Sequence, residues 1–188
     1  MKEQWLEQGY KDFALEGPDN LSINLIGREI GASRSSFYHH FAEIDIFIDE
    51  LLQMHWSICQ AFTEAGKESC KHLIPDLYDL LATYPIPLQF SRQLFRHRHI
   101  PRYKYLFART YDLSSEAFIM DLFARHLDLE VPQRDLNQLF ATLGEAWYSR
   151  LDPNDLSAAT LRRHAEDILQ DLSSLMDSGI YSSLRKVP

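Results

Sequence analysis

Two short helical segments joined by a three-residue turn constrain the fold of this chain more than any other feature. Apolar side chains at Ile23, Ile26 and Ile30 recur at intervals of three and four residues, the period of a helix with one buried face. Ser22 precedes this segment and is suited to an N-cap, and Gly31-Ala32-Ser33 separates it from the next segment. Two short helices joined by a glycine-containing turn predict a helix-turn-helix.

The rest of the chain continues the helical period, and no stretch shows the alternation of a half-buried strand. The predicted fold class is therefore all-α. No apolar run approaches the roughly 20 residues that cross a bilayer, and no secretory signal follows Met1, so we expect a cytoplasmic protein without membrane contact. The expected helices are 3–16, 22–30, 34–41, 45–68, 71–84, 86–97, 102–110, 114–128, 133–150 and 157–177.

The charge of the chain argues against nucleic acid as a partner at first sight. The net charge is −8, and residues 1–50 carry four basic against ten acidic residues. Within residues 22–42, however, Arg28 and Arg34 face only Glu29, because the acids cluster in the first and fourth helices. The field over the helix-turn-helix is therefore expected to be weakly positive.

The pattern of nucleophiles, acids and metal ligands predicts neither an enzyme nor a metal or cofactor site. Cys59 and Cys70 show no C-x-x-C spacing, which favours two inert reduced thiols over a single disulfide. His97 and His99 lie two residues apart, which in a helix directs them to different sides, so the run 96–99 is interpreted as a solvated loop. The isolated histidines are given no role: His55, His126 and His164.

The segment 21–41 resembles the DNA-binding region of the TetR (tetracycline-repressor-like) family. It has the small hydroxyl cap, the glycine turn, the basic Arg34 and the terminal Phe37-Tyr38-His39-His40-Phe41 in the family's order. The close resemblance covers residues 5–55. It implies a bacterial transcription factor with a helix-turn-helix DNA-binding domain over 1–44 and a helical ligand-binding and dimerisation domain over 45–188.

The residue chemistry of the helix-turn-helix supports the same interpretation. Phe37 and Phe41 lie four residues apart and can anchor the recognition helix inward, which leaves its other face outward. Arginine, hydroxyl and imidazole groups are those that contact phosphates and base edges. The expected DNA-binding residues are Ser22, Arg28, Ser33, Arg34, Ser35, Ser36, Tyr38, His39 and His40.

Two positions depart from the family pattern. The family usually has a lysine at the start of the fourth helix, where it meets a phosphate, and this chain has Ile44 between two acids. The family often has a basic arm before the first helix, and here only residues 1–4 precede it. Both departures predict weaker DNA binding.

The aromatic-rich middle of the chain is where the resemblance places an effector pocket. Aromatic walls with few polar groups suit a flat or hydrophobic small molecule. The alternative, residue by residue, is ordinary core packing. The expected lining residues are Tyr78, Phe90, Tyr103, Phe107, Phe118 and Trp147.

The last two helices carry apolar stripes that the resemblance assigns to a homodimer interface over 133–150 and 157–177. The implied function is a regulator, in most family members a repressor, that binds a pseudo-palindromic double-stranded operator and responds to a small-molecule effector. The alternative is a dimeric helical module for protein interaction or ligand binding whose head has lost DNA binding, as the acidic first 50 residues suggest.

Overall fold

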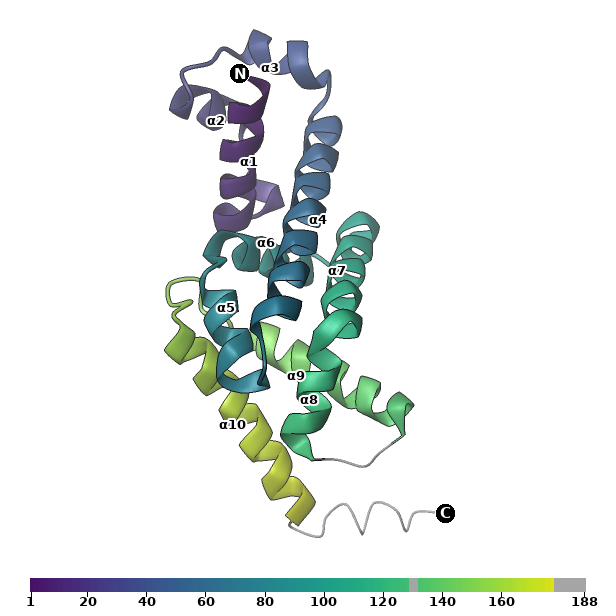
Figure 1. Cartoon of the computed structure of the whole chain (residues 1–188). Helices are drawn as coiled ribbons and strands as arrows, with labels where there is room; N and C mark the ends of the chain where they lie inside the picture. Colours follow the sequence, from purple (N-terminus) through teal and green to yellow (C-terminus); the bar gives the residue numbers. More distant parts are fainter. Residues whose placement is uncertain (129–131, 178–188) are drawn as a thin grey trace.

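The computed structural model describes residues 1–128 and 132–177, so the ranges 129–131 and 178–188 of the expected body domain lie outside the described residues. Within the described ranges the chain consists of helices and turns without a strand, which confirms the all-α prediction. Figure 1 shows α2 and α3 at one end of the molecule, α8 and α10 at the other, and α4 running from the first end into the body.

The N-terminal head contains α1 (Lys2–Glu16), α2 (Ile23–Glu29) and α3 (Arg34–Phe41). The predicted serine caps are present, because Ser22 Oγ accepts a hydrogen bond from the Leu25 amide at 3.4 Å and Ser33 Oγ from the Ser36 amide at 3.2 Å. These caps start α2 and α3 at the positions that the sequence indicates.

A long helix, α4 (Ile44–Ser69), leads from the head into the body. The larger helices of the body are α6 (Pro85–Arg96), α7 (Pro101–Ser114), α8 (Met120–Leu127), α9 (Gln133–Arg150) and α10 (Ala158–Asp177). Prolines stand in the first turn of α6 and α7, where the missing N–H costs no hydrogen bond.

Two predicted boundaries in the body are wrong. The helix expected over 71–84 is interrupted at Ile74, whose extended backbone (φ −121°, ψ 126°) follows from its place before Pro75; a wide turn (η2, Leu73–Leu77) then leads into the short α5 (Tyr78–Ala82). In contrast, the break expected between 110 and 114 is absent. There α7 continues through a wide turn (η3, Ser115–Ile119) into α8.

Two hydrophobic clusters hold the helices together. The first joins the head to the body, because Trp5, Phe13 and Phe37 belong to the same cluster as Phe90 and Leu94 of α6. The second lies inside the body and includes residues from α8, α9 and α10. The head is therefore packed against the body through a common core, chiefly where α1 lies on α6.

None of the helices in the described ranges combines the length and the apolar character that a membrane span requires.

Candidate nucleic-acid interface and ligand pocket

The turn between α2 and α3 is closed by one short backbone hydrogen bond and one glycine. The Ala32 amide donates to the Gly27 carbonyl at 2.7 Å, and Gly31 has a φ of +68°, which an L side chain rarely adopts. A Cβ on Gly27 would lie 2.8 Å from the Ala32 carbonyl oxygen and 3.0 Å from the Trp5 ring. Helix α2 therefore packs against the turn at Ala32 and against Trp5 of α1 at distances that only glycine allows.

Helix α3 is anchored by its aromatic face and exposes its polar face. Phe37 and Phe41 are buried, and the Phe37 ring meets the Trp5 ring edge-on at 5.2 Å. On the other side, Arg34 Nη2 donates to Tyr38 Oη at 3.2 Å, so the two side chains form one exposed unit. The orientation predicted from the four-residue spacing is therefore the one that the structure has.

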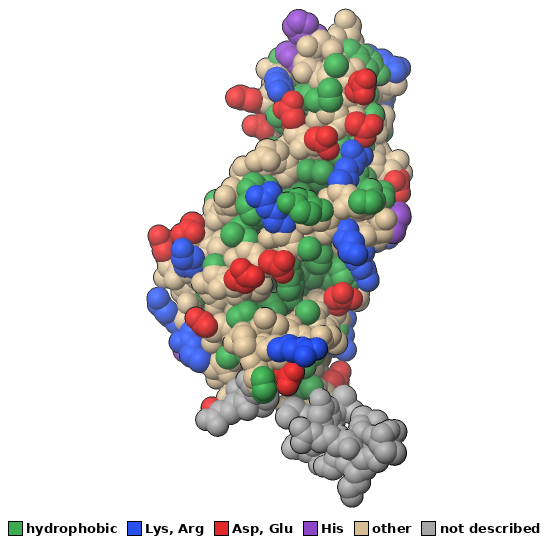
Figure 2. Space-filling view, turned by 90° about the vertical axis from the view of Figure 1, so that its right-hand side faces the viewer, with side chains coloured by type: hydrophobic (Ala, Val, Ile, Leu, Met, Phe, Trp, Pro, Cys, Tyr) green, Lys and Arg blue, Asp and Glu red, His purple; other side chains and the backbone are tan. Residues whose placement is uncertain are grey.

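All nine residues proposed to contact DNA lie at the surface of the head. Ser22, Ser36 and His40 are half-buried, and the others are exposed: Arg28, Ser33, Arg34, Ser35, Tyr38 and His39. They belong to α2, to α3 and to the caps of these helices. Figure 2 shows histidine side chains at the tip of this end of the molecule.

Three acids in the first turns of α4 form ion pairs with partners that the sequence alone does not reveal. Arg102 of α7 contacts Asp45 at 3.0 Å and Asp49 at 3.6 Å, and Lys2 contacts Glu50 at 2.7 Å. These pairs reduce the negative field near the start of α4, where the 38% exposed Ile44 stands at the position of the family's lysine.

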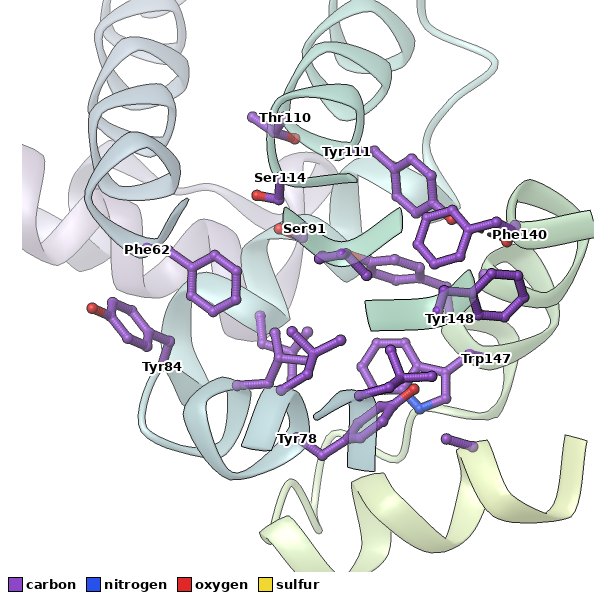
Figure 3. Close-up of a pocket in the computed structure, with 18 of the residues that line it drawn as sticks. Phe62, Tyr78, Tyr84, Ser91, Thr110, Tyr111, Ser114, Phe140, Trp147 and Tyr148 are labelled. Carbon is purple, nitrogen blue, oxygen red and sulfur yellow. Dashed lines mark hydrogen bonds between the residues drawn. The ribbon is translucent and has the colours of Figure 1, made fainter. Parts of the chain in front are cut away.

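The body contains a mainly apolar cavity between α4, α6, α7, α9 and α10. The volume of this cavity, taken as the space open to the centre of a water molecule, is about 160 Å³. Figure 3 shows the labelled side chains around it, with Ser91, Thr110 and Ser114 toward one side and Tyr78 and Trp147 toward another. Its lining, taken from the described residues, contains no carboxylate, ammonium, guanidinium or imidazole group. The cavity is therefore suited to an uncharged molecule.

Only two of the six residues expected to line a pocket do so, namely Tyr78 and Trp147. Phe90 and Tyr103 are instead buried in the seam between head and body, where Phe13 stacks on Phe90 at 4.2 Å.

The other two expected residues are also core side chains. Phe107 packs between Phe95 and Tyr148, with ring centroids at 5.4 and 5.0 Å, and Phe118 fills the space beside Gly66. Aromatic composition does not distinguish a cavity wall from a packed core, because both require the same side chains.

The sequence interpretation missed the hydroxyl-bearing residues of the lining. Ser91 follows Pro87 by four residues on α6, and Ser114 follows Thr110 by four on α7, so each pair shares an inward helical face. Small hydroxyl side chains on otherwise apolar stripes are the signal that could have located the cavity.

Two interpretations of histidines are corrected. Residues 97–99 form a turn after α6, and Arg96, Arg98 and His99 are exposed as expected, but His97 is half-buried. Its Nδ1 lies 2.8 Å from the Gln93 carbonyl oxygen and its Nε2 lies 3.4 Å from Asp19, so it contributes to the seam between head and body. His55 is fully buried and hydrogen-bonded on both ring nitrogens, to Tyr10 and to Ser91. Across the described ranges, no three His, Cys, Asp or Glu side chains gather in a way that could hold a metal ion.

Both cysteines are free thiols in the structure. Burial raises the pKa of Cys59 to about 12, and it also raises the pKa of Cys70. Cys59 lines the cavity as a neutral thiol, so it contributes a weak polar contact and no negative charge.

The apolar stripes of α9 and α10 face the protein's own body. Leu136, Trp147, Leu161 and Ile168 are buried in the second hydrophobic cluster, and Gly144 faces the Tyr111 hydroxyl. Leu139, Phe140 and Leu143 on the same stripe of α9 are only half-buried. The homodimer interface over 133–150 and 157–177 stays a prediction.

Comparison with known proteins agrees with the architecture. Residues 6–51 match the model of the bacterial regulatory proteins of the tetR family. A transcriptional regulator (TerR/AcrR family) from Aquifex aeolicus VF5 is similar in structure, with a TM-score of 0.55 and 16% identity over 93% of this chain and 98% of the other. A protein described as a TetR-family transcriptional regulator from Mesorhizobium loti MAFF303099 has a TM-score of 0.54 and 17% identity over 93% and 95%. No curated protein matches the chain significantly.

The similarity to the solved structures concerns the fold, whereas the match over 6–51 concerns the helix-turn-helix itself, with its capped α3 and its exposed Arg34–Tyr38 face. Residues 6–51 therefore match the helix-turn-helix region of the bacterial regulatory proteins of the tetR family, and the described chain shares its fold with solved structures of transcriptional regulators.

Proposed function

We propose that this regulator is a repressor whose affinity for its operator is changed by a small molecule bound in the body cavity. The observation that carries the proposal is the course of α4. This helix begins beside α3, and its residues Ile58, Cys59 and Phe62 line the cavity. Because its 26 residues extend about 39 Å, one rigid element reaches both sites.

On the DNA side, Arg34 and Tyr38 would contact base edges and phosphates, and the capped starts of α2 and α3 would direct backbone amides toward phosphates. The weakly positive face from 22 to 42 is surrounded by acids that have partners within the protein, such as Asp45 and Asp49. An overall acidic chain with a small positive face disfavours non-specific binding.

We further propose a homodimer through the exposed faces of α9 and α10, within the predicted ranges 133–150 and 157–177. Two recognition helices about 34–36 Å apart would read successive major grooves of a pseudo-palindrome. The exposed Ala141 and Thr142 of α9 offer small side chains that would allow close approach. A change in the angle between protomers would then alter the spacing of the two heads.

The test is a gel-shift titration of the purified protein against DNA upstream of its own gene, at several salt concentrations. Arg34→Ala is expected to weaken operator binding by about 1–3 kcal/mol. Lys67→Ala, which removes one positive charge at the far end of α4, is the matched control and should bind like the unaltered protein. Operator binding by Arg34→Ala at full affinity would remove Arg34 from the interface.

The acidic head favours one alternative, a dimeric helical module without DNA binding. A discrete shift that competitor DNA does not abolish supports the repressor. Absence of a shift here, followed by failure of a genome-wide fragment selection, would favour the module.

A further inference from the structure

A chain of hydrogen bonds runs from the cavity to the DNA-binding head through the centre of the protein. Ser91 Oγ of α6 lies 3.1 Å from His55 Nε2 of α4, and His55 Nδ1 lies 2.8 Å from Tyr10 Oη of α1. The His55 ring also stacks on Phe90 at 4.4 Å. The histidine that the sequence left without a role therefore connects three helices at the seam between head and body.

The direction of these hydrogen bonds follows from burial. Burial lowers the pKa of His55 to about 3, so the ring is neutral and carries one N–H. Within the described part of the chain, the Tyr10 hydroxyl has His55 as its hydrogen-bond partner. Tyr10 must therefore donate to Nδ1, because the opposite arrangement would leave a buried O–H without an acceptor. The His55 proton then lies on Nε2 and is donated to Ser91.

Ser91 consequently accepts from His55 and donates its own hydroxyl hydrogen to Tyr148, another residue of the lining. Ser91 lines the cavity, where several other polar groups are already satisfied within the protein. Thr110 donates to the Leu106 carbonyl at 3.0 Å, Tyr111 to a main-chain carbonyl at 3.2 Å, and Trp147 to the Leu161 carbonyl at 3.2 Å. Ser91 is thus a hydrogen-bond donor in the lining of an uncharged cavity, and a ligand oxygen would take its hydrogen in place of Tyr148.

The size and polarity of the cavity define the ligand class. An apolar cavity of about 150 Å³ binds benzene, and this one offers about 160 Å³ with one donor connected to the head. A charged ligand would be left without a counter-charge in the lining. The complementary molecule is a small, uncharged aromatic compound with an acceptor oxygen.

We propose that Ser91 is the ligand-sensing residue of this cavity, that it donates a hydrogen bond to the carbonyl oxygen of a small uncharged aromatic compound, and that the Tyr10–His55–Ser91 chain transmits this contact to the head. The proposal rests on the proposed function for its biological meaning, whereas its chemistry is testable without DNA.

The transmission step follows from the packing of α1 on α6. Tyr10 and Phe13 stack on Phe90 at 4.5 and 4.2 Å, and Phe90 is the neighbour of Ser91. A ligand that draws Ser91 toward the cavity weakens its bond to His55. The buried imidazole N–H then has only the weak acceptor Cys59 Sγ at 3.5 Å. It regains the Ser91 oxygen if α6 shifts relative to α4, and this shift moves α1. The ligand therefore binds the two arrangements with different affinity, as coupling requires.

The probes are acetophenone, ethylbenzene of nearly the same shape without the acceptor, and benzoate with a charge. Calorimetric titration of the full-length protein should show that acetophenone binds roughly threefold to tenfold more tightly than ethylbenzene, and that benzoate binds weakest. Ser91→Ala should abolish this preference and leave ethylbenzene affinity within about twofold. Ser91→Thr should restore it, and Ser149→Ala, which removes an exposed hydroxyl of α9 outside the lining, should retain it.

Failure of both acetophenone and ethylbenzene to bind would overturn the ligand class. An acetophenone preference that survives in Ser91→Ala would overturn the role of Ser91. Because Ser91→Ala could unfold, thermal melting of each variant accompanies the titrations, and Ser91→Thr repeats the comparison with a hydroxyl in place.

The chain itself is tested by nitrogen-15 NMR of the imidazole side chains, with the His55 signal assigned by its loss in His55→Gln. We expect the Nε2–H tautomer in the free protein and a displaced signal with acetophenone. Tyr10→Phe should keep acetophenone affinity within about twofold but remove its effect on operator affinity. An unchanged His55 signal would overturn the transmission. If operator binding is absent while these results hold, the proposed function fails and the ligand assignment stands.

Discussion

The role of His55 could not be predicted from the sequence and becomes visible only in the structure. On the sequence it is an isolated histidine in the fourth helix, and in the structure it is fully buried between Tyr10, Phe90 and Ser91. The groups that face it are neutral: a phenol from α1, an aromatic ring and a hydroxyl from α6, and the Cys59 thiol 3.5 Å from Nε2. No nearby carboxylate among these partners stabilises a protonated imidazole.

This environment predicts a pH dependence of stability. An unfolded histidine has a pKa near 6.5, whereas burial lowers the folded value to about 3. Between these values the unfolded chain binds a proton that the folded protein does not, so the free energy of unfolding falls as the pH falls. At pH 5 this single residue lowers it by about 2 kcal/mol relative to neutral pH.

The measurement is urea unfolding at pH 5 and at pH 7.5. His55→Gln should lose about 2 kcal/mol less than the unaltered protein over this step. His126→Gln, which removes an exposed histidine, is the matched control. Equal losses in His55→Gln and the unaltered protein would show that His55 accepts a proton in the folded state.

At the scale of elements, the turn between α2 and α3 and the start of α4 decide how the head meets DNA. The Gly27 carbonyl accepts the hydrogen bond that closes the turn, and its missing Cβ leaves room for Ala32 and Trp5. The start of α4 lies next in the chain after α3 and exposes Ile44 and Ile46. The turn therefore controls stability of the head, and the start of α4 is a place where affinity can be altered.

Gly27→Ala should destabilise the protein by about 1–3 kcal/mol, because the new methyl group meets a backbone carbonyl that cannot move independently. The free energy of unfolding in urea measures this effect. Asn24→Ala, at an exposed position of the same helix, should remain within about 0.5 kcal/mol. A Gly27→Ala protein of unchanged stability would mean that α2 and the turn separate without cost.

Ile44→Lys should tighten operator binding and increase the slope of log affinity against log salt by about one phosphate contact. The side chain is 38% exposed at the first position of α4, so a lysine fits there without burial of its charge. Ile46→Lys is the control, because it adds the same charge at a 44% exposed position about 200° around the helix from Ile44. The slope of log affinity against log salt is compared between the two variants. Equal slopes for both variants would place Ile44 away from the DNA.

For the whole molecule, the decisive property is that head and body do not have separate cores. Phe13 of α1 stacks on Phe90 of α6, and Gln93 Nε2 donates to the Ala14 carbonyl at 3.3 Å. A boundary near residue 44 separates the proposed DNA-binding region from the proposed effector-binding region, but both regions contribute side chains to the same hydrophobic cluster. The long α4 and the α1–α6 seam are the two connections through which the proposed effector would act on the head.

A prediction at this scale concerns the proposed homodimer. Sedimentation velocity should show a dimer, and Ala141→Arg should shift it toward the monomer, because the exposed side of α9 would then carry a long charged side chain at the proposed interface. Ala61→Arg, at an exposed position of α4, should leave the dimer intact. A dimer that tolerates Ala141→Arg would place the interface on another surface.

Local patterns in the sequence were sufficient for the helices of the head. The caps Ser22 and Ser33, the turn at Gly31 and the inward Phe37 and Phe41 depend on interactions within a few residues, and the structure has each of them. The same rules erred near Pro75, where the local effect of a proline on the preceding residue was underestimated.

The sequence by itself determined the all-α fold, the helix-turn-helix and the outward face of α3, because helical period and capping are local properties. Only the tertiary structure decided which aromatic residues surround a cavity, that the stripes of α9 and α10 face the body, and that His55 joins Tyr10 to Ser91. The two hydrogen bonds of His55 join residues that are 36 and 45 positions apart. The side-chain types that make such contacts are the same ones that fill an ordinary core.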